Sequence, residues 1–411
     1  MQTKIKHLIN KGVSIPNPDS IEIGADLNVD HISGDGVHIH SGCKLLGRST
    51  RIGPQTTLGA EAPVTIQDCQ IGPQVSLNGG YFKKSVFLEK ASAGSGSHVR
   101  EGCLFEEEAS IAHTVGLKQT ILLPFVTLGS LINFCDCLMA GGSSRRNHSE
   151  VGSSYIHFNF TPNQDKATPS LIGDVPKGVM LDQAPIFLGG QGGLVGPSRI
   201  AYGTIAAAGT ILRKDILQVN RMIIETAGRG GSVPYVAGRY QVIKRIVHNN
   251  LLYMGNVVAL MQWYHYVRSQ FISKRFPDVL CQAGHQKLEI ILNERIRRLH
   301  QLSEKMDRSI QDHSEKKDSA SVSKLLMQQQ ELFDKKDILT DRLHDAASFA
   351  GNAQDRDQFL DNLNATVDTS QSYVSAIQSL DTDTKTMGTN WLQSIVDHML
   401  QVALKILPSF R

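Results

Sequence analysis

The sequence predicts an all-β left-handed parallel β-helix over residues 1–215, followed by an all-α helical domain over residues 216–411. Two observations support this division. Glycine and proline are concentrated before residue 216, where 28 of the 36 Gly and 11 of the 14 Pro fall. The first part also repeats an aliphatic residue followed by glycine with a period of six, whereas the later part spaces its apolar residues three or four positions apart, as helices do.

The six-residue repeat is clearest at Ile21-Glu-Ile-Gly24, Arg51-Ile-Gly53, Gln70-Ile-Gly72, Val151-Gly152 and Leu171-Ile-Gly173. In a hexapeptide β-helix each repeat supplies a short strand and a turn. Three repeats make one triangular coil with aliphatic side chains stacked inside. The alternative is an antiparallel sandwich, whose strands would alternate with period two between turns at roughly 8–12-residue spacing. The observed unit is shorter and more regular, and therefore favours the β-helix.

The second part predicts helices throughout. Residues 240–272 suggest one or two amphipathic helices, and residues 283–347 suggest an antiparallel helical hairpin or coiled coil. The segment 391–407 is apolar on more than one face. We expect it to dock on the other helices, because an interfacial membrane helix normally carries more Lys and Arg than the single Lys405 found there. This half is a candidate surface for a protein partner.

The composition excludes several functional classes. With 411 residues, 41% of them hydrophobic, and a net charge of +3, the chain fits neither global disorder nor a polybasic nucleic-acid binder. The six cysteines are scattered without paired zinc-ligand spacing, so we expect reduced thiols and no metal site. The sequence has no secretory leader pattern and no apolar stretch of about 18 residues. We therefore expect a cytoplasmic protein that binds no nucleic acid and does not span a membrane.

A more specific pattern overlies the repeat. Its motifs are His98-Val-Arg-Glu-Gly102, Thr114-Val-Gly-Leu-Lys-Gln119, Val151-Gly-Ser-Ser-Tyr-Ile-His-Phe-Asn-Phe160, Leu171-Ile-Gly-Asp174, Leu194-Val-Gly-Pro197 and Ala206-Ala-Ala-Gly-Thr210. In this order they resemble the C-terminal acetyltransferase half of the bifunctional N-acetylglucosamine-1-phosphate uridylyltransferase/glucosamine-1-phosphate acetyltransferase family, within the hexapeptide-repeat acyltransferases. The resemblance covers roughly residues 12–215.

The resemblance implies a homotrimer that binds acetyl-CoA in the groove between neighbouring rods, with an amino sugar phosphate or nucleotide sugar beside the thioester. The residues that it places at the phosphate or sugar are Arg100, Lys118, Asn133 and Lys166. Those that it places along acetyl-CoA are Ser153, Asn159, Phe160, Gly190 and Ala208. The structural alternatives are exposed surface charges, turn residues and coil spacers.

The histidine that the resemblance would make catalytic is missing. Acyl transfer to an amine needs a base that takes the amine proton, and a neutral imidazole suits this role. The family carries this histidine in Gly-His-Leu-Thr-Tyr, which corresponds here to Gly129-Ser-Leu-Ile-Asn133. A lone serine cannot replace an imidazole unless a base lies beside it. The candidate catalytic residues are therefore His148, His157, Glu150 and Ser130, and the basic insertion 141–146 is expected to be an exposed loop near the phosphate site.

The expected function is acyl transfer from acyl-CoA to an amino sugar phosphate in nucleotide-sugar metabolism. The alternative is a catalytically inactive trimer that binds a nucleotide sugar or acts as a scaffold. Uridylyltransferase (pyrophosphorylase) activity is not expected, because the chain enters the repeats almost at once and lacks the Gly-rich loop of that half of the family.

Overall fold

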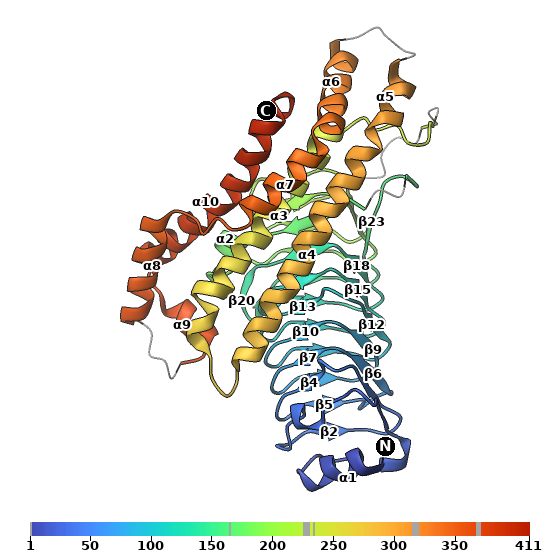
Figure 1. Cartoon of the computed structure of the whole chain (residues 1–411), viewed down its shortest axis with the longest axis vertical. Coiled ribbons are helices and arrows are strands. Elements are labelled where there is room, and N and C mark those ends of the chain that lie inside the picture. Colours follow the sequence, from blue (N-terminus) through green and yellow to red (C-terminus); the bar gives the residue numbers. More distant parts are fainter. Residues whose placement is uncertain (1, 164–165, 225–230, 233–234, 315–319, 367–370) are drawn as a thin grey trace.

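The computed structural model describes residues 2–163, 166–224, 231–232, 235–314, 320–366 and 371–411. Figure 1 shows a three-sided coil of short strands, with helices packed against one side of it. The strands of each side pair in parallel with the strands of the next coil. The predicted left-handed parallel β-helix followed by a helical region is confirmed.

Most coils contribute one strand to each of three sheets, which we name faces A, B and C. Within a coil the chain passes from face B to face C, then to face A, and back to face B. Face B contains β1 (Glu22–Ile23), β3 (Lys44–Leu46), β6 (Val64–Gln67), β9 (Gly80–Lys83), β12 (Ser97–Val99), β15 (Gly116–Lys118), β18 (Asn133–Cys135), β23 (Ile156–Phe158), β26 (Gly193–Val195) and β29 (Ile211–Leu212).

The other two faces are built in the same way. Face C contains β4 (Arg51–Ile52), β7 (Gln70–Ile71), β10 (Val86–Phe87), β13 (Leu104–Phe105), β16 (Ile121–Leu122), β19 (Cys137–Met139), β24 (Ser170–Ile172) and β27 (Arg199–Ile200). Face A contains β2 (His38–Ile39), β5 (Thr57–Leu58), β8 (Ser76–Leu77), β11 (Ser92–Ala93), β14 (Ser110–Ile111), β17 (Thr127–Leu128), β22 (Glu150–Val151), β25 (Phe187–Leu188), β28 (Ile205–Ala206) and β30 (Met222–Ile223).

The core of the β-helix is a stack of equivalent side chains. Because alternate residues of a strand point to opposite sides of a sheet, each short strand sends one or two side chains inward. Along face B the in-register residues Leu45, Ile66, Phe82, Val99 and Leu117 are all buried. Burying such a side chain contributes about 1.5–3 kcal/mol, and the repeat supplies one such residue in every coil.

The corner between faces A and B repeats one backbone conformation. The turn residues Thr114, Leu131, Ser154, Gln191 and Gly209 all have φ between 53° and 76°. This left-handed region is costly for residues with a Cβ, yet four of the five carry one. The neighbouring coils therefore hold these turns in place, and the residue before each turn recurs at the same position on the corner.

Additional elements close the ends and interrupt the coils. Helix α1 (Gln2–Asn10), which the sequence analysis did not predict, covers the first coil with its buried Ile5 and Leu8. The short helices η1 (Pro18–Ser20) and η2 (Val29–His31) lie in the first coils. The insertion at 141–146, expected to be a loop, lies within an antiparallel hairpin of β20 (Gly142–Ser144) and β21 (Asn147–His148).

The helical part covers face C. Helices α3 (Ile243–Tyr266) and α4 (Asp278–Glu304) contact strands of this face, and α10 (Thr382–Ile406) packs on α3 (Figure 1). The other helices are α2 (Val175–Gly178), η3 (Arg268–Phe271), α5 (Met306–Ser314), α6 (Ala320–Asp334), α7 (Lys336–Ala346), α8 (Ala353–Thr366), α9 (Tyr373–Ser379) and η4 (Pro408–Phe410). Helices α4 and α5 run antiparallel to α6 and α7. In the described residues, no helix is long and apolar enough to cross a membrane.

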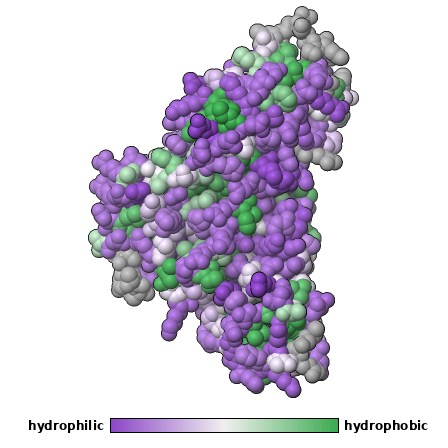
Figure 2. Space-filling view, viewed as in Figure 1, coloured by the Kyte–Doolittle hydropathy of each residue, from purple (hydrophilic) through white to green (hydrophobic). Residues whose placement is uncertain are grey.

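Buried polar contacts join the two parts. Arg268 is fully buried and donates to the Glu107 carboxylate at 3.1 Å and 2.5 Å, while the Tyr264 hydroxyl donates to Glu106 at 2.8 Å. Arg295 of α4 pairs with Asp136 at 3.0 Å. The side of the molecule on which the helices lie is mostly hydrophilic (Figure 2). Face C is therefore an internal surface, and faces A and B are the sides that these helices leave uncovered.

Candidate functional site

Four of the predicted residues occupy one column on the A–B corner. The backbone N–H of the residue after each donates to the preceding coil: Ser154 to Ser130 at 2.8 Å, Gln191 to Ser153 at 2.8 Å, and Gly209 to Gly190 at 2.9 Å. Ala208, which precedes Gly209, takes the next place. This column of Ser130, Ser153, Gly190 and Ala208 has small side chains in every coil and is at least partly exposed. It offers a narrow strip along which an extended ligand can lie without steric obstruction.

The sequence did not indicate the histidine that lies one coil before this column. His113 lies one coil before Ser130, and its carbonyl oxygen accepts from the Leu131 N–H at 3.1 Å. The His113 Nδ1 atom is 2.8 Å from Ser130 Oγ, and the pair is exposed. The available signal was the spacing of 17 residues, which is close to the 18 of three hexads. Ser130 is therefore not a lone serine, because an imidazole is its hydrogen-bond partner.

Asn133, Lys118 and Arg100 extend the surface across face B. Asn133 lies on β18, three residues after Ser130, which at about 3.3 Å per residue puts it roughly 10 Å or less from the column. Lys118 is in register with Cys135 of β18. The Arg100 Nη2 atom is 4.0 Å from the Cys135 sulfur. The exposed side of face B thus has the small-residue column at one edge and two cationic side chains at the other.

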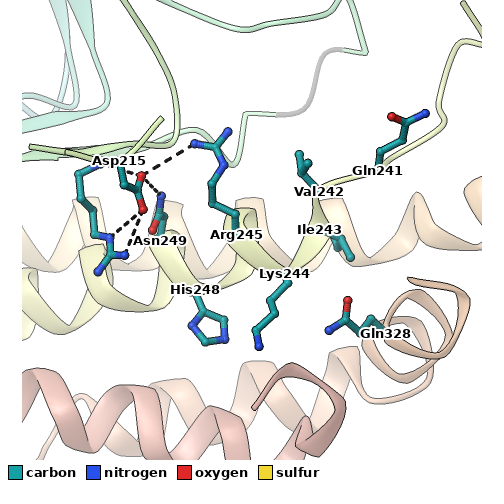
Figure 3. A pocket seen from close by; sticks show the side chains of 10 residues that line it. Asp215, Gln241, Val242, Ile243, Lys244, Arg245, His248, Asn249 and Gln328 are labelled. Atoms are coloured by element: carbon teal, nitrogen blue, oxygen red, sulfur yellow. Dashed lines mark hydrogen bonds and ion pairs between the residues drawn. The ribbon is translucent and has the colours of Figure 1, made fainter. Parts of the chain in front are cut away.

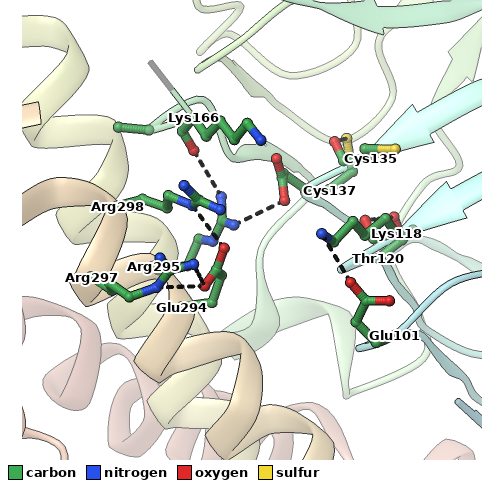
Figure 4. Close-up of polar contacts among 12 residues, drawn as sticks. Glu101, Lys118, Thr120, Cys135, Cys137, Lys166, Glu294, Arg295, Arg297 and Arg298 are labelled. Carbon is green, nitrogen blue, oxygen red and sulfur yellow. Dashed lines mark hydrogen bonds and ion pairs between the residues drawn. The ribbon is translucent and has the colours of Figure 1, made fainter. Parts of the chain in front are cut away.

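The cationic edge also carries a carboxylate. The Lys118 Nζ atom is 2.9 Å from the Glu101 carboxylate (Figure 4). Burial works against ionisation of Glu101, but the hydrogen bond and charge of Lys118 and the charge of Arg100 still hold its pKa below the ordinary value. Lys118 is therefore already paired, and a bound phosphate would compete with Glu101 for its ammonium group.

Lys166 lies near the same edge but contacts the helical part. Its backbone carbonyl accepts from Arg295 Nη1 at 3.2 Å (Figure 4). The Nη2 atom of the same guanidinium pairs with Asp136 at 3.0 Å. Asp136 in turn donates its backbone N–H to the Lys118 carbonyl at 2.9 Å. The structure thus links Lys166 to Lys118 through Asp136 and Arg295.

Asn159 and Phe160 lie away from the A–B column. They follow β23 at the edge of face B that adjoins face C, and the Phe160 side chain is 74% exposed. Nearby, the Asn163 side chain accepts from the Tyr235 hydroxyl at 2.9 Å and from the Gly238 N–H at 3.0 Å. The width of face B therefore separates these two residues from Ser153, Gly190 and Ala208, with which the sequence grouped them.

His148 and Glu150 lie together, at the far edge of face A. His148 Nε2 is 3.8 Å from the Glu150 carboxylate, and His148 Nδ1 is 2.9 Å from the Arg145 carbonyl. Arg145 holds the hairpin against the coils by donating to the carbonyls of Glu108 and Phe125 at 3.0 Å and 2.9 Å. Face A therefore separates this pair from the column that contains Ser130.

His157 points into the β-helix. It continues the inward stack of face B, where its ring contacts Phe134 edge-on at 6.2 Å and its Nε2 lies 2.9 Å from Ser170 Oγ. Desolvation is the main reason that its pKa is lowered to about 4. His157 is therefore a neutral core residue in this fold, and its ring does not face either exposed surface.

The cysteines, the acidic groups and the pocket at the start of α3 do not form a second site with the residues that the sequence predicted. All six cysteines are free, and only Cys135 is not fully buried. Within the described ranges, no group of three or more His, Cys, Asp or Glu could hold a metal ion. A pocket of about 430 Å³ lies where the last coils meet the start of α3 (Figure 3). There Asp215 accepts from Arg199 at 3.0 Å and from Asn249 at 3.0 Å, so its main charges are already paired.

The β-helix half is similar to proteins named bifunctional protein GlmU. The relative from Thermotoga petrophila is 26% identical over 216 residues, which are 52% of this chain and 42% of the relative. The relatives from Trichlorobacter lovleyi and Fervidobacterium nodosum are each 27% identical, over 51% and 52% of this chain and 40% and 42% of their own lengths. The chain thus spans less than half the length of these relatives and is homologous to them over about half of its own.

Comparisons with protein families and with solved structures add little to this similarity. No protein-family model matches the chain. Among solved structures, LpxA from Acinetobacter baumannii aligns with 50% of this chain and 66% of its own, at 13% identity and a TM-score of 0.17.

Proposed function

We propose that this protein is a hexapeptide-repeat acyltransferase that transfers an acetyl or related acyl group from acyl-CoA to the amine of an amino sugar phosphate or nucleotide sugar. The similarity to GlmU over half of the chain supports the class of protein. The observation that carries the proposal is the A–B column, in which Ser130, Ser153, Gly190 and Ala208 stand in register in successive coils.

The two edges of face B suit the two substrates. The small side chains of the column leave room for the extended arm of acyl-CoA along the corner. Arg100 and Lys118, at the other edge, are suited to a phosphate, because a guanidinium binds oxyanions in a bidentate manner. Asn133 lies between them and offers both a donor and an acceptor to a sugar. In this arrangement the acceptor amine and the thioester would meet near Ser130.

A trimer would complete this surface. The helices cover face C, so faces A and B are the sides of the β-helix that a neighbouring copy could contact. Face A carries an in-register apolar ladder of Phe187, Ile205 and Met222, which are 38%, 45% and 64% exposed. This ladder flanks the column in the same coils, and a second copy packed on it would form the other wall of the groove. A mass of 45.1 kDa by light scattering, which is that of a single chain, would contradict the trimer and the groove between copies.

The test of the proposal is release of CoA from acetyl-CoA in the presence of a panel of amino sugar phosphates. Ala208→Phe is expected to raise the KM for acetyl-CoA at least about tenfold, because the ring would fill the strip beside Gly190. Ala60→Phe is the matched control, since Ala60 is an exposed alanine at the same corner of an early coil. Wild-type protein that neither releases CoA nor binds acetyl-CoA would contradict the proposal.

A catalytically inactive binding protein is the second candidate. It is favoured by Ser130, which stands where the resemblance places the family's histidine. This candidate predicts that acetyl-CoA or a nucleotide sugar binds and that Ala208→Phe weakens binding, but that no CoA is released with any acceptor.

A further inference from the structure

His113 and Ser130 form a pair that no sequence motif indicated. The two side chains come from adjacent coils of the A–B corner, and their Nδ1 and Oγ atoms are 2.8 Å apart. Ser130 also receives support from the next coil, since its backbone N–H donates to Ser153 Oγ at 3.2 Å. His113 is exposed, so its ring can meet a ligand that lies on the corner.

We propose that His113 is the general base of the acyl transfer and that Ser130 positions its ring. The inference rests on the proposed function and names the residue that takes the proton. When the His113 Nδ1–H is donated to Ser130 Oγ, the Nε2 lone pair is left for the substrate. In this arrangement the Ser130 hydroxyl accepts the hydrogen bond, and a basic nitrogen of His113 stays exposed.

The transfer step balances with these groups alone. The amine nitrogen attacks the thioester carbonyl carbon, so a C–N bond forms and the C–S bond breaks. The amine proton passes to His113 Nε2, and the CoA thiolate then leaves and takes this proton from the imidazolium. No oxidant or reductant is involved, and His113 returns to its neutral form.

The coil spacing explains how a histidine from one coil earlier can do this. Neighbouring coils of the β-helix lie about 4.8 Å apart, and the 2.8 Å contact with Ser130 Oγ spans this gap. The His113 ring therefore extends to the Ser130 position, where the resemblance locates the family's own histidine. A base moved by one coil would act at the same place on the corner.

A carboxylate lies further back along the same corner. Glu61 is hydrogen-bonded to Ser95, the residue one coil before His113 on this corner, and accepts from Asn78 Nδ2 at 2.9 Å. These two hydrogen bonds, with a smaller contribution from the charge of His113, lower the pKa of Glu61. Glu61 is thus an ionised group on this corner whose charge interacts with that of His113.

The other histidines near the site are placed less well. His157 is enclosed in the core, and His148 lies across face A beside Glu150. His98 lies on face B with its ring 5.1 Å from that of Tyr81, two coils before Asn133. Of these histidines, His113 is the one that contacts a residue of the column.

The experiment measures CoA release and its pH dependence for wild-type protein and for His113→Gln, Ser130→Ala and Ser130→Thr. His113→Gln is expected to lower kcat by about 10²–10⁴-fold and to abolish the acidic limb of the rate profile, because an amide does not titrate. Ser130→Ala should lower kcat by less than His113→Gln does and should shift the acidic limb of the rate profile. Ser130→Thr should restore both the rate and the position of this limb, since threonine keeps the hydroxyl. His38→Gln, at an exposed histidine of face A, is the control and should leave both kcat and the pH profile unchanged.

Two results separate this inference from the proposed function. Turnover by wild-type protein with an unchanged rate and profile in His113→Gln would overturn the role of His113 and leave the acyltransferase standing. The absence of turnover in wild-type protein would overturn both. Nitrogen chemical shifts of His113 give a readout apart from turnover: the Nδ1–H tautomer is expected in wild-type protein, and a mixture in Ser130→Ala. An Nε2–H tautomer in wild-type protein would contradict the positioning role of Ser130.

Discussion

The carboxyl group of Glu106 allows a quantitative test of how the helical part docks on the β-helix. Its side chain lies at the end of face C, is 1% exposed, and accepts from the Tyr264 hydroxyl of α3. Burial raises its pKa from 4.5 to about 7, against the opposing charge of Arg268 and with a further increase from Glu107. The folded protein therefore favours the protonated form of Glu106 more strongly than the unfolded chain does.

The sign and size of the effect follow from this difference. A group whose pKa rises on folding stabilises the fold fully below its unfolded pKa, and that contribution is lost as the pH rises through the folded value. Between 4.5 and about 7 the loss is roughly 3 kcal/mol, at about 1.4 kcal/mol per pKa unit. Glu106→Gln mimics the protonated carboxyl and can still accept from Tyr264. We expect it to raise the free energy of unfolding by roughly 3 kcal/mol at pH 8 and by less than about 1 kcal/mol at pH 5.

Urea unfolding followed by tryptophan fluorescence measures this change in the relevant part of the molecule. The two tryptophans of the chain, Trp263 and Trp391, are both buried in the helical part. Glu108→Gln is the matched control: its carboxylate is partly exposed and lies 3.9 Å from Lys90, so its effect should stay within about 0.5 kcal/mol. A Glu106→Gln variant that is equally stabilised at pH 5 and pH 8, or destabilised at pH 8, would refute the reasoning.

Two further predictions concern buried charge and the rival bases. Arg268→Met should destabilise the helical part by about 3–5 kcal/mol in the same urea assay, because it leaves the Glu107 carboxylate without its partner. The double variant Arg268→Met with Glu107→Leu should recover most of this loss of stability. Equal losses of stability in the single and double variants would contradict this explanation. His157→Leu should lower the thermal midpoint but keep acyl transfer, since the His157 ring is a core side chain. His148→Gln should change neither the thermal midpoint nor the rate of acyl transfer. A large loss of turnover in either variant at an unchanged thermal midpoint would contradict this and indicate that the substituted histidine takes part in catalysis.

The sequence predicted candidate site residues but could not assign each of them to a surface of the β-helix. Ser130, Ser153, Gly190 and Ala208 fall into one column because the repeat fixes where each coil turns. The repeat alone did not separate Asn159 and Phe160 from this column, although β23 (Ile156–Phe158) crosses face B before them and places them at its opposite edge. It also does not show the hairpin that holds His148 beside Glu150. Insertions between strands shift later residues off the repeat, and only the folded coil resolves where they go.

The local rule of six residues per strand and turn was enough to define a three-sided parallel coil and its aliphatic core. Each of these depends on contacts between equivalent residues of neighbouring coils, which a periodic sequence encodes directly. Which histidine meets Ser130, which one enters the core, and which face the helices cover were decided by tertiary structure. The contacts of the helices join residues whose separations follow no period, such as Arg268 with Glu107, and they form only when the folded coil brings those side chains together.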